Sequence, residues 1–168
     1  DLGPHAGGRL LLGLQITHRH PTRLGRVDGR PRLVVRETSS GGEHTIAFDE
    51  EAYSLGLGGS MEFETTNLRF VYSSMTTPQE TYDYDLTTRE RTLRKRQEVT
   101  SGHEPADYVT RRLLAKTPDG EEVPITLVHR ADVKLPAPTL LYGYGSYGSS
   151  MSPSFSATRL SLINRDII

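Results

Sequence analysis

Hydrophobic and polar residues alternate through the middle of the chain, and this alternation predicts a series of short antiparallel β-strands. Turn signals such as Asp28-Gly29 and Gly41-Gly42 separate the alternating stretches. The predicted strands lie, in chain order, at residues 30–37, 44–48, 52–59, 68–74, 81–86 and 91–99. Residues 1–25 mix Gly, Arg, His and Pro without sustained alternation, so we leave them unassigned.

Within residues 1–25, one group of apolar side chains is dense enough to predict a short buried element. Its members are Leu10, Leu11, Leu12, Leu14 and Ile16. Beyond residue 25, the strands form two successive antiparallel units. Units of this size are typical of β-propeller blades, which are four-stranded sheets around a central channel. Two blades cannot close a ring, so we expect an incomplete propeller.

The pattern changes near Ser101, where longer strands are predicted at residues 110–116 and 122–130. The apolar run TLLYGYG, residues 139–145, then predicts a buried strand, and residues 156–165 have helical spacing. A strand, a Gly-rich loop and a helix in this order indicate the beginning of an α/β layer. Asp166 follows the helix at a place where a glycine is common.

The composition of the 168 residues excludes several classes of function but does not identify one. The net charge of -1 gives no field that would favour nucleic acid or an anionic membrane surface. There is no Cys, which excludes disulfides and thiolate metal sites and fits the cytoplasm. No apolar run approaches the roughly 20 residues of a membrane span, and the first residues do not form a convincing signal peptide. We therefore expect a cytoplasmic protein without a membrane partner.

The Gly-rich loop offers a first candidate for chemistry. Gly143, Gly145 and Gly148 match G-x-G-x-x-G, and Asp166 lies about 20 residues further on, as in a dinucleotide-binding fingerprint. That fingerprint needs the helix to begin within the glycines, whereas residues 149–153 intervene here. The tyrosines of the loop would also crowd a phosphate. Nucleotide binding therefore stays open as an alternative, but it is not the preferred interpretation.

The same loop suits an acyl-transfer site, because a tyrosine at the carboxyl end of a strand can aim its phenolic donor at an oxyanion. The simpler interpretation is that Tyr142, Tyr144 and Tyr147 are ordinary core and surface aromatics. A hydrolase of this kind also needs a nucleophile in G-x-S-x-G. The sequence has only near misses, at Ser60 and Ser146.

Other charged and ligating residues are better explained as structural. The histidines are scattered and predict no metal site, and no motif calls for a cofactor. The basic run at residues 89–96 resembles a nucleic-acid patch, but neighbouring acids make a solvated strand face the better prediction. These acids are Asp83, Asp85, Glu90 and Glu98.

Three long stretches carry a resemblance to a known family. They are LRFVYSSMTTPQETYDYDLTTRERTLRKRQEV, SGHEPADYVTRRLLAKTPDGEEVPITLVHR and PTLLYGYGSYG. In sequence and in order they are similar to serine peptidases of the prolyl oligopeptidase family, of the oligopeptidase B type. The resemblance implies that residues 26–98 are the C-terminal part of a β-propeller. It also implies that residues 99–168 begin an α/β-hydrolase domain.

The family resemblance also implies roles for two tyrosines. Tyr144 matches the residue that donates its hydroxyl to the oxyanion, and Tyr147 matches an aromatic residue beside the scissile bond. The Ser, Asp and His of the triad would lie downstream of Ile168, so we expect the isolated chain to be inactive. The expected substrates of the parent enzyme are short peptides, cut after Arg or Lys. A non-catalytic β-rich interaction module remains a further alternative, and exposed strand edges predict self-association.

Overall fold

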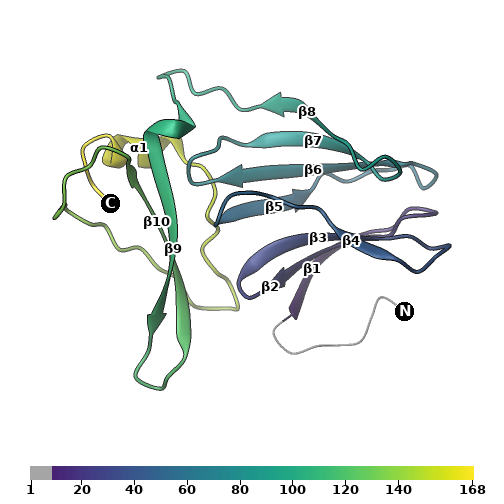
Figure 1. Cartoon of the computed structure of the whole chain (residues 1–168), viewed down its shortest axis with the longest axis horizontal. Coiled ribbons are helices and arrows are strands. Elements are labelled where there is room, and N and C mark those ends of the chain that lie inside the picture. The colour runs from purple at the N-terminus through teal and green to yellow at the C-terminus, as the bar shows by residue number, and fades with distance from the viewer. Residues whose placement is uncertain (1–8) are drawn as a thin grey trace. The chain divides into compact units, whose positions relative to one another are not determined.

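A computed structural model describes residues 9–168 of the chain. Within this range two four-stranded sheets are followed by a two-stranded hairpin and one α-helix (Figure 1). No helix in the described part of the chain is long and apolar enough to cross a membrane.

The first sheet is antiparallel, and its strands lie in chain order. The β2–β3 turn contains Asp28 and Gly29, both with positive φ, and this geometry matches the twist of a tight hairpin. The sheet contains β1 (Arg9–Gln15), β2 (Thr22–Val27), β3 (Arg30–Arg36) and β4 (Glu43–Thr45).

The second sheet repeats this order, and its β6–β7 and β7–β8 pairs are antiparallel. Its strands are β5 (Tyr53–Leu57), β6 (Asn67–Ser74), β7 (Glu80–Asp85) and β8 (Arg91–Arg96). Two consecutive four-stranded sheets are the pattern expected for propeller blades. The alternation of the sequence therefore predicted these strands correctly, with ends that differ by a few residues.

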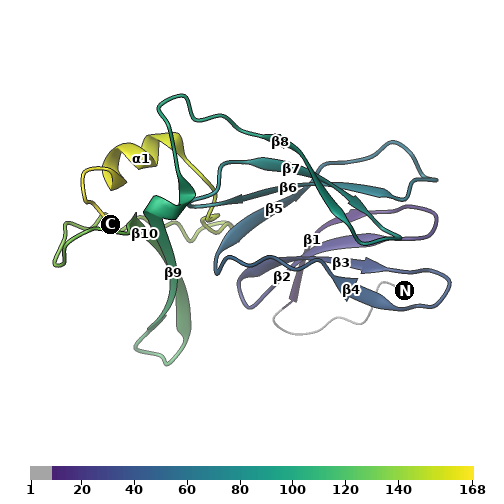
Figure 2. The ribbon, with the colours of Figure 1, turned by 45° about the horizontal axis from the view of Figure 1, so that its top comes forward.

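The rest of the chain begins with a 3-10 helix, Pro105–Asp107, which leads into β9 (Tyr108–Lys116). β9 pairs with β10 (Glu122–Arg130) through a regular antiparallel register. Figure 2 shows this hairpin as a long ribbon with α1 (Ala157–Ile163) beside it. Both hairpin strands and the helix were predicted.

The described residues form two compact units. The first contains residues 9–49, Leu55–Tyr72 and Glu80–Arg96. Its core follows from the period of two along each strand, because alternate side chains point to one face. Leu33 and Val35 of β3 and Leu68 and Phe70 of β6 are fully buried.

The second unit contains Glu50–Ser54, Ser73–Gln79 and Gln97–Ile168. Its small core joins Val128 of β10 to Leu160 and Ile163 of α1, at positions three apart on one helix face. Met75, Val99, Tyr108 and Phe155 pack around it. This core holds α1 against the hairpin.

Two expectations from the sequence were wrong in detail. The apolar group in residues 10–16 does form a strand, β1, but its side chains are exposed rather than buried. Leucines follow one another there, so both faces of an edge strand carry them, and the described residues cover them only in part. The run at residues 139–145 is not a buried strand. Leu140 and Leu141 are 60% and 80% exposed, and the only backbone ladder contact of this run among the described residues is with Ile168.

Candidate oxyanion loop

The backbone around Thr139 makes a parallel bridge with the last residue of the chain. The Leu140 N–H donates to the Ile168 carbonyl at 2.8 Å, and the Ile168 N–H donates to the Pro138 carbonyl at 2.9 Å. Bonds that straddle one residue in this way are typical of parallel strands, which need a long crossover that is usually helical. Helix α1 lies between these two paired segments, and neither segment is long enough to form a strand.

The tyrosine loop, residues 142–150, follows the carboxyl end of this short parallel segment. It contains a tight turn in which the Ser149 N–H donates to the Ser146 carbonyl at 3.0 Å. The central residues Tyr147 and Gly148 have φ values of 57° and 65°. Positive φ is unusual for a bulky side chain. Such backbone outliers cluster at functional sites, where surrounding structure holds them.

The three tyrosines of the loop all reach solvent. Tyr142, Tyr144 and Tyr147 are 72%, 50% and 98% exposed. A Cβ added at Gly143 or Gly145 would meet nothing within 4 Å, so close packing does not demand glycine there. Of the simpler interpretation, as ordinary core and surface aromatics, the surface part therefore holds, and none of the three is a core residue. Their phenolic hydroxyls are available to donate to a bound group.

The end of the loop is anchored to the second unit. The Phe155 N–H donates to the Ser73 hydroxyl at 3.0 Å, and Arg159 donates to the Ser154 carbonyl at 2.9 Å. The Phe155 ring meets the His103 ring edge-on at a centroid distance of 4.9 Å. His103 in turn stacks on Tyr108, and its Nε2 lies 2.5 Å from the Thr76 carbonyl oxygen. These contacts could not be predicted from the sequence, because they join segments that are distant along the chain.

Helix α1 begins and ends with well-formed caps. Ser156 is the N-cap, and its hydroxyl accepts from the Arg159 N–H. At the other end Asp166 adopts φ 60°, while its N–H donates to Ile163 and the next N–H donates to Leu162. This is a Schellman motif with Asp at the left-handed position that glycine usually occupies.

The cap geometry weakens the dinucleotide interpretation. In that fingerprint the helix starts within the glycines, so that its N-terminus meets the pyrophosphate. Here the helix starts at Ala157, well after Gly148. Asp166 closes that helix instead of following a second strand. The glycines therefore lack the helix terminus that a nucleotide would need.

The two near-miss serines do not form a nucleophile elbow. The Ser60 hydroxyl accepts from the Glu62 N–H at 3.2 Å, as in a local turn. Ser146 lies in the turn that carries Tyr147, and no helix follows it directly. Neither serine sits between a strand and a helix as G-x-S-x-G chemistry requires.

The basic run forms a solvated strand face, as predicted. Every residue of β8 is exposed. Asp83 receives two hydrogen bonds from Arg69, at 2.7 and 2.9 Å, and pairs with Arg94 at 3.3 Å. The hydrogen bonding from Arg69 lowers the pKa of Asp83. No group of three or more His, Asp or Glu side chains in residues 9–168 could hold a metal ion.

Comparison with known proteins identifies the family. Residues 1–97 match the family described as prolyl oligopeptidase, N-terminal beta-propeller domain. The match includes residues 1–25, which the sequence analysis left unassigned. Over 133 residues, 77% of this chain, it is 44% identical to dipeptidyl aminopeptidase BI of Pseudoxanthomonas mexicana and covers 18% of that protein. It is also 30% identical to protease 2 of Moraxella lacunata, over 86% of this chain and 21% of that protein.

Solved structures agree with the sequence matches. Oligopeptidase B from Trypanosoma brucei, in a closed form with covalently bound antipain, superposes with a TM-score of 0.90 at 34% identity. That match covers 99% of this chain and 25% of the trypanosomal chain. Both four-stranded sheets lie within residues 1–97, the part of the chain that matches the N-terminal β-propeller domain of a peptidase family. The chain belongs to the prolyl oligopeptidase family of serine peptidases, which confirms the resemblance to the oligopeptidase B type.

Proposed function

We propose that the chain is part of a serine oligopeptidase that hydrolyses short peptides after Arg or Lys. Residues 26–98 supply propeller strands in this proposal, and residues 99–168 begin the α/β-hydrolase domain. Tyr144 donates its hydroxyl to the developing oxyanion, and Tyr147 lies beside the scissile bond. The cytoplasmic location expected from the sequence is part of the same proposal.

One observation carries the proposal most directly. The two main-chain hydrogen bonds between residues 138–140 and Ile168 support it, because the tyrosine loop follows this parallel pairing and α1 lies between the two paired segments. In open α/β sheets, ligands bind in the crevice outside the carboxyl ends of the strands. A phenol suits the oxyanion role, because near neutral pH it keeps the proton that it donates.

The chain spans only about a quarter of the trypanosomal enzyme's length, so the proposal includes residues that other segments must supply. The triad is the main example, since no described serine has a nucleophile elbow. In isolation the chain is expected to hydrolyse no peptide. Its contribution is the oxyanion donor and the wall of the substrate site.

A chimera tests the role of Tyr144. The matched segment of Trypanosoma brucei oligopeptidase B is replaced by this chain, and hydrolysis of a fluorogenic peptide with Arg before the scissile bond is measured. Tyr144→Phe is expected to lower kcat about 100- to 1000-fold, the usual effect of losing one oxyanion donor. Tyr142→Phe, also in the loop, should change kcat less than about threefold.

Assembly of the chimeric site is checked separately by covalent capture of antipain, detected by mass spectrometry. If the chimera captures antipain and hydrolyses the peptide, but Tyr144→Phe leaves kcat unchanged, the oxyanion role of Tyr144 is wrong. A chimera that folds and hydrolyses only peptides without Arg or Lys would instead refute the proposed specificity.

A further inference from the structure

A cavity of about 320 Å³ lies within the first unit, and none of its lining residues belongs to the tyrosine loop. It is lined by residues of β4 and the segment after it, by β7, and by the β7–β8 turn and β8. The lining residues that matter here are His44, Ile46, Ala47, Tyr84, Arg89 and Arg91. The proposed peptidase activity uses none of them.

The inner part of the cavity combines an apolar surface with two polar rings. Ile46 and Tyr84 are 6% and 5% exposed. The Tyr84 hydroxyl lies 3.0 Å from Nε2 of His44, so the two side chains hold each other in place. A hydroxyl and an imidazole at the base of a cavity can both hydrogen-bond to a bound oxyanion.

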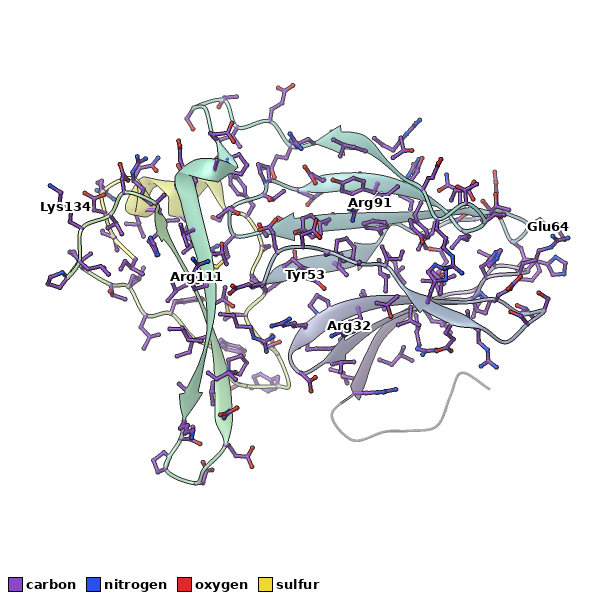
Figure 3. The ribbon with its side chains drawn as sticks, viewed as in Figure 1. Arg32, Tyr53, Glu64, Arg91, Arg111 and Lys134 are labelled. Atoms are coloured by element: carbon purple, nitrogen blue, oxygen red, sulfur yellow. The ribbon has the colours of Figure 1, made fainter. Side chains whose placement is uncertain are left out.

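Arg91 also lines the cavity, and its neighbours hold it in position. Its guanidinium carbon lies 5.2 Å from the centroids of both the Phe48 and Tyr82 rings. One of its nitrogens also donates to the Ala47 carbonyl at 3.4 Å. Figure 3 labels this side chain. Because Arg91 is already ordered, binding an anion there costs little side-chain entropy.

Arg89 supplies the second guanidinium from an unusual backbone position. Its φ is 65°, in the left-handed region that favours glycine. Its N–H donates to the Asp85 carbonyl and closes the turn. Within residues 9–168, its guanidinium has no ion pair. A strained backbone that presents an unpaired cation is more typical of a binding site than of a stabilising contact.

The acids nearby are occupied by other donors. The Glu37 carboxylate accepts from the Ser39 and Ser40 hydroxyls at 3.0 and 2.7 Å. Asp85 accepts from the backbone of the turn, through two N–H groups at 2.7 and 2.8 Å. These hydrogen bonds lower the pKa of both acids, which therefore keep their negative charge, but neither carboxylate forms an ion pair with Arg89 or Arg91. Burial lowers the pKa of His44, and the charges of Arg89 and His20 lower it further.

We propose that this cavity binds the phosphate group of a small molecule, with Arg89 and Arg91 as its two cationic ligands. Phosphate carries a charge close to -2, which two guanidiniums match, and guanidinium forks bind such oxygens in bidentate geometry. Tyr84 and His44 complete the polar contacts, and Ile46 and Ala47 accommodate carbon atoms of a phosphate monoester.

The proposal is tested by NMR titration of the ¹⁵N-labelled chain with inorganic phosphate and, separately, with glycerol 3-phosphate. Ionic strength is held constant with chloride, because salt screens exposed charges. Amide shifts are expected in residues 44–47 and 84–91, with a dissociation constant on the order of 1 mM. Tighter binding of the monoester would identify an organic phosphate as the ligand, and equal binding would identify the free ion. Both results support the site.

Two variants separate binding from folding. Arg89→Gly removes the guanidinium and places the residue that prefers φ 65°, so its melting temperature should not fall. It is expected to weaken phosphate binding about tenfold or more, the effect of losing one charge-assisted ligand. Lys95→Gln removes the same charge from β8 outside the cavity and should change binding less than about twofold.

Three results would overturn the proposal. The first is an equal loss of affinity in both variants, which would mean general attraction to a basic surface. The second is binding of acetate as tight as that of phosphate, which would remove the selectivity. The third is an absence of shifts in residues 44–47 at phosphate concentrations well above the millimolar range.

Discussion

Four described residues other than glycine have positive φ, and each marks a place where the chain turns sharply. They are Asp28, Arg89, Tyr147 and Asp166. Asp and Asn tolerate this region better than bulky residues, since a short polar side chain can bond locally. Tyr147 and Arg89 have long side chains that do not make such a local bond. They lie in the two places where we propose ligands. Asp166 is different, because its role at the end of α1 is structural.

Asp166→Gly should therefore stabilise the second unit. Glycine pays no steric penalty at φ 60°, and the Schellman hydrogen bonds are made by backbone atoms that the change leaves in place. The expected gain in the free energy of unfolding is about 0.5–1 kcal/mol, measured by urea denaturation. Asp166→Ala keeps the Cβ and should give no gain. If Ala stabilises as much as Gly, loss of the carboxylate is the cause, and the backbone argument is wrong.

At the scale of elements, the sequence predicted those strands and helices that follow from the pattern of neighbouring residues. Period-two alternation in β3, β6 and β7 and helical spacing at Leu160 and Ile163 located those elements within a few residues. The prediction that the apolar residues of β1 are buried was wrong, because consecutive leucines do not reveal which face of a strand is covered. The tyrosine loop was found through a motif, whereas the Arg89 and Arg91 cavity was not. The residues that line this cavity come from strands about 40 residues apart, and no pattern of neighbouring residues indicates that these strands lie close together.

Strand β7 also carries a buried hydrogen-bonded group that links it to β8. Glu80 is 3% exposed and accepts from the Tyr82 hydroxyl at 2.5 Å and from Arg96 at 2.7 Å. Arg96 lies directly opposite Glu80 in the register. Burial, followed by the hydrogen bond to Glu80 and the charge of Glu80, raises the pKa of Tyr82 to about 12. The neutral phenol is therefore the form that the fold stabilises.

The contribution of Tyr82 to the free energy of unfolding should consequently decrease at alkaline pH. An unfolded tyrosine ionises near pH 10, so the contribution is fully present below about pH 10 and is lost as the pH rises towards 12. Tyr82→Phe should lower the free energy of unfolding by about 1 kcal/mol at pH 8, the value of one hydrogen bond. The difference between wild type and variant should shrink between pH 10 and 12.

Urea denaturation at pH 8, 10, 11 and 12 measures this difference, with Tyr142→Phe as a control that removes a hydroxyl from an exposed ring. The control should match the wild type at every pH. A gap between wild type and Tyr82→Phe that stays constant from pH 10 to 12 would show that Tyr82 is not preferentially neutral in the folded chain.

At the scale of the whole molecule, the described chain leaves large apolar surfaces open. Leu10, Leu11 and Leu12 of β1 are 52%, 57% and 44% exposed, and β1 is the end strand of its sheet. In the β9–β10 hairpin Leu113, Leu114 and Val123 are about half exposed as well. Exposed apolar side chains on an edge strand are typical of a contact surface. The family match explains its presence, since propeller blades pack face to face.

The chain alone is therefore expected to self-associate through β1. Sedimentation velocity at several concentrations should show dimers or larger species that increase with concentration, because edge strands with apolar faces pair readily. Leu11→Lys places a charge on that edge and should shift the distribution towards monomer by about tenfold in the association constant, the result of losing one buried leucine contact. Thr87→Lys adds the same charge in the β7–β8 turn and should leave the distribution unchanged. A wild-type chain that stays monomeric at all concentrations would refute this expectation, and equal effects of the two lysines would assign the association to net charge instead of to β1.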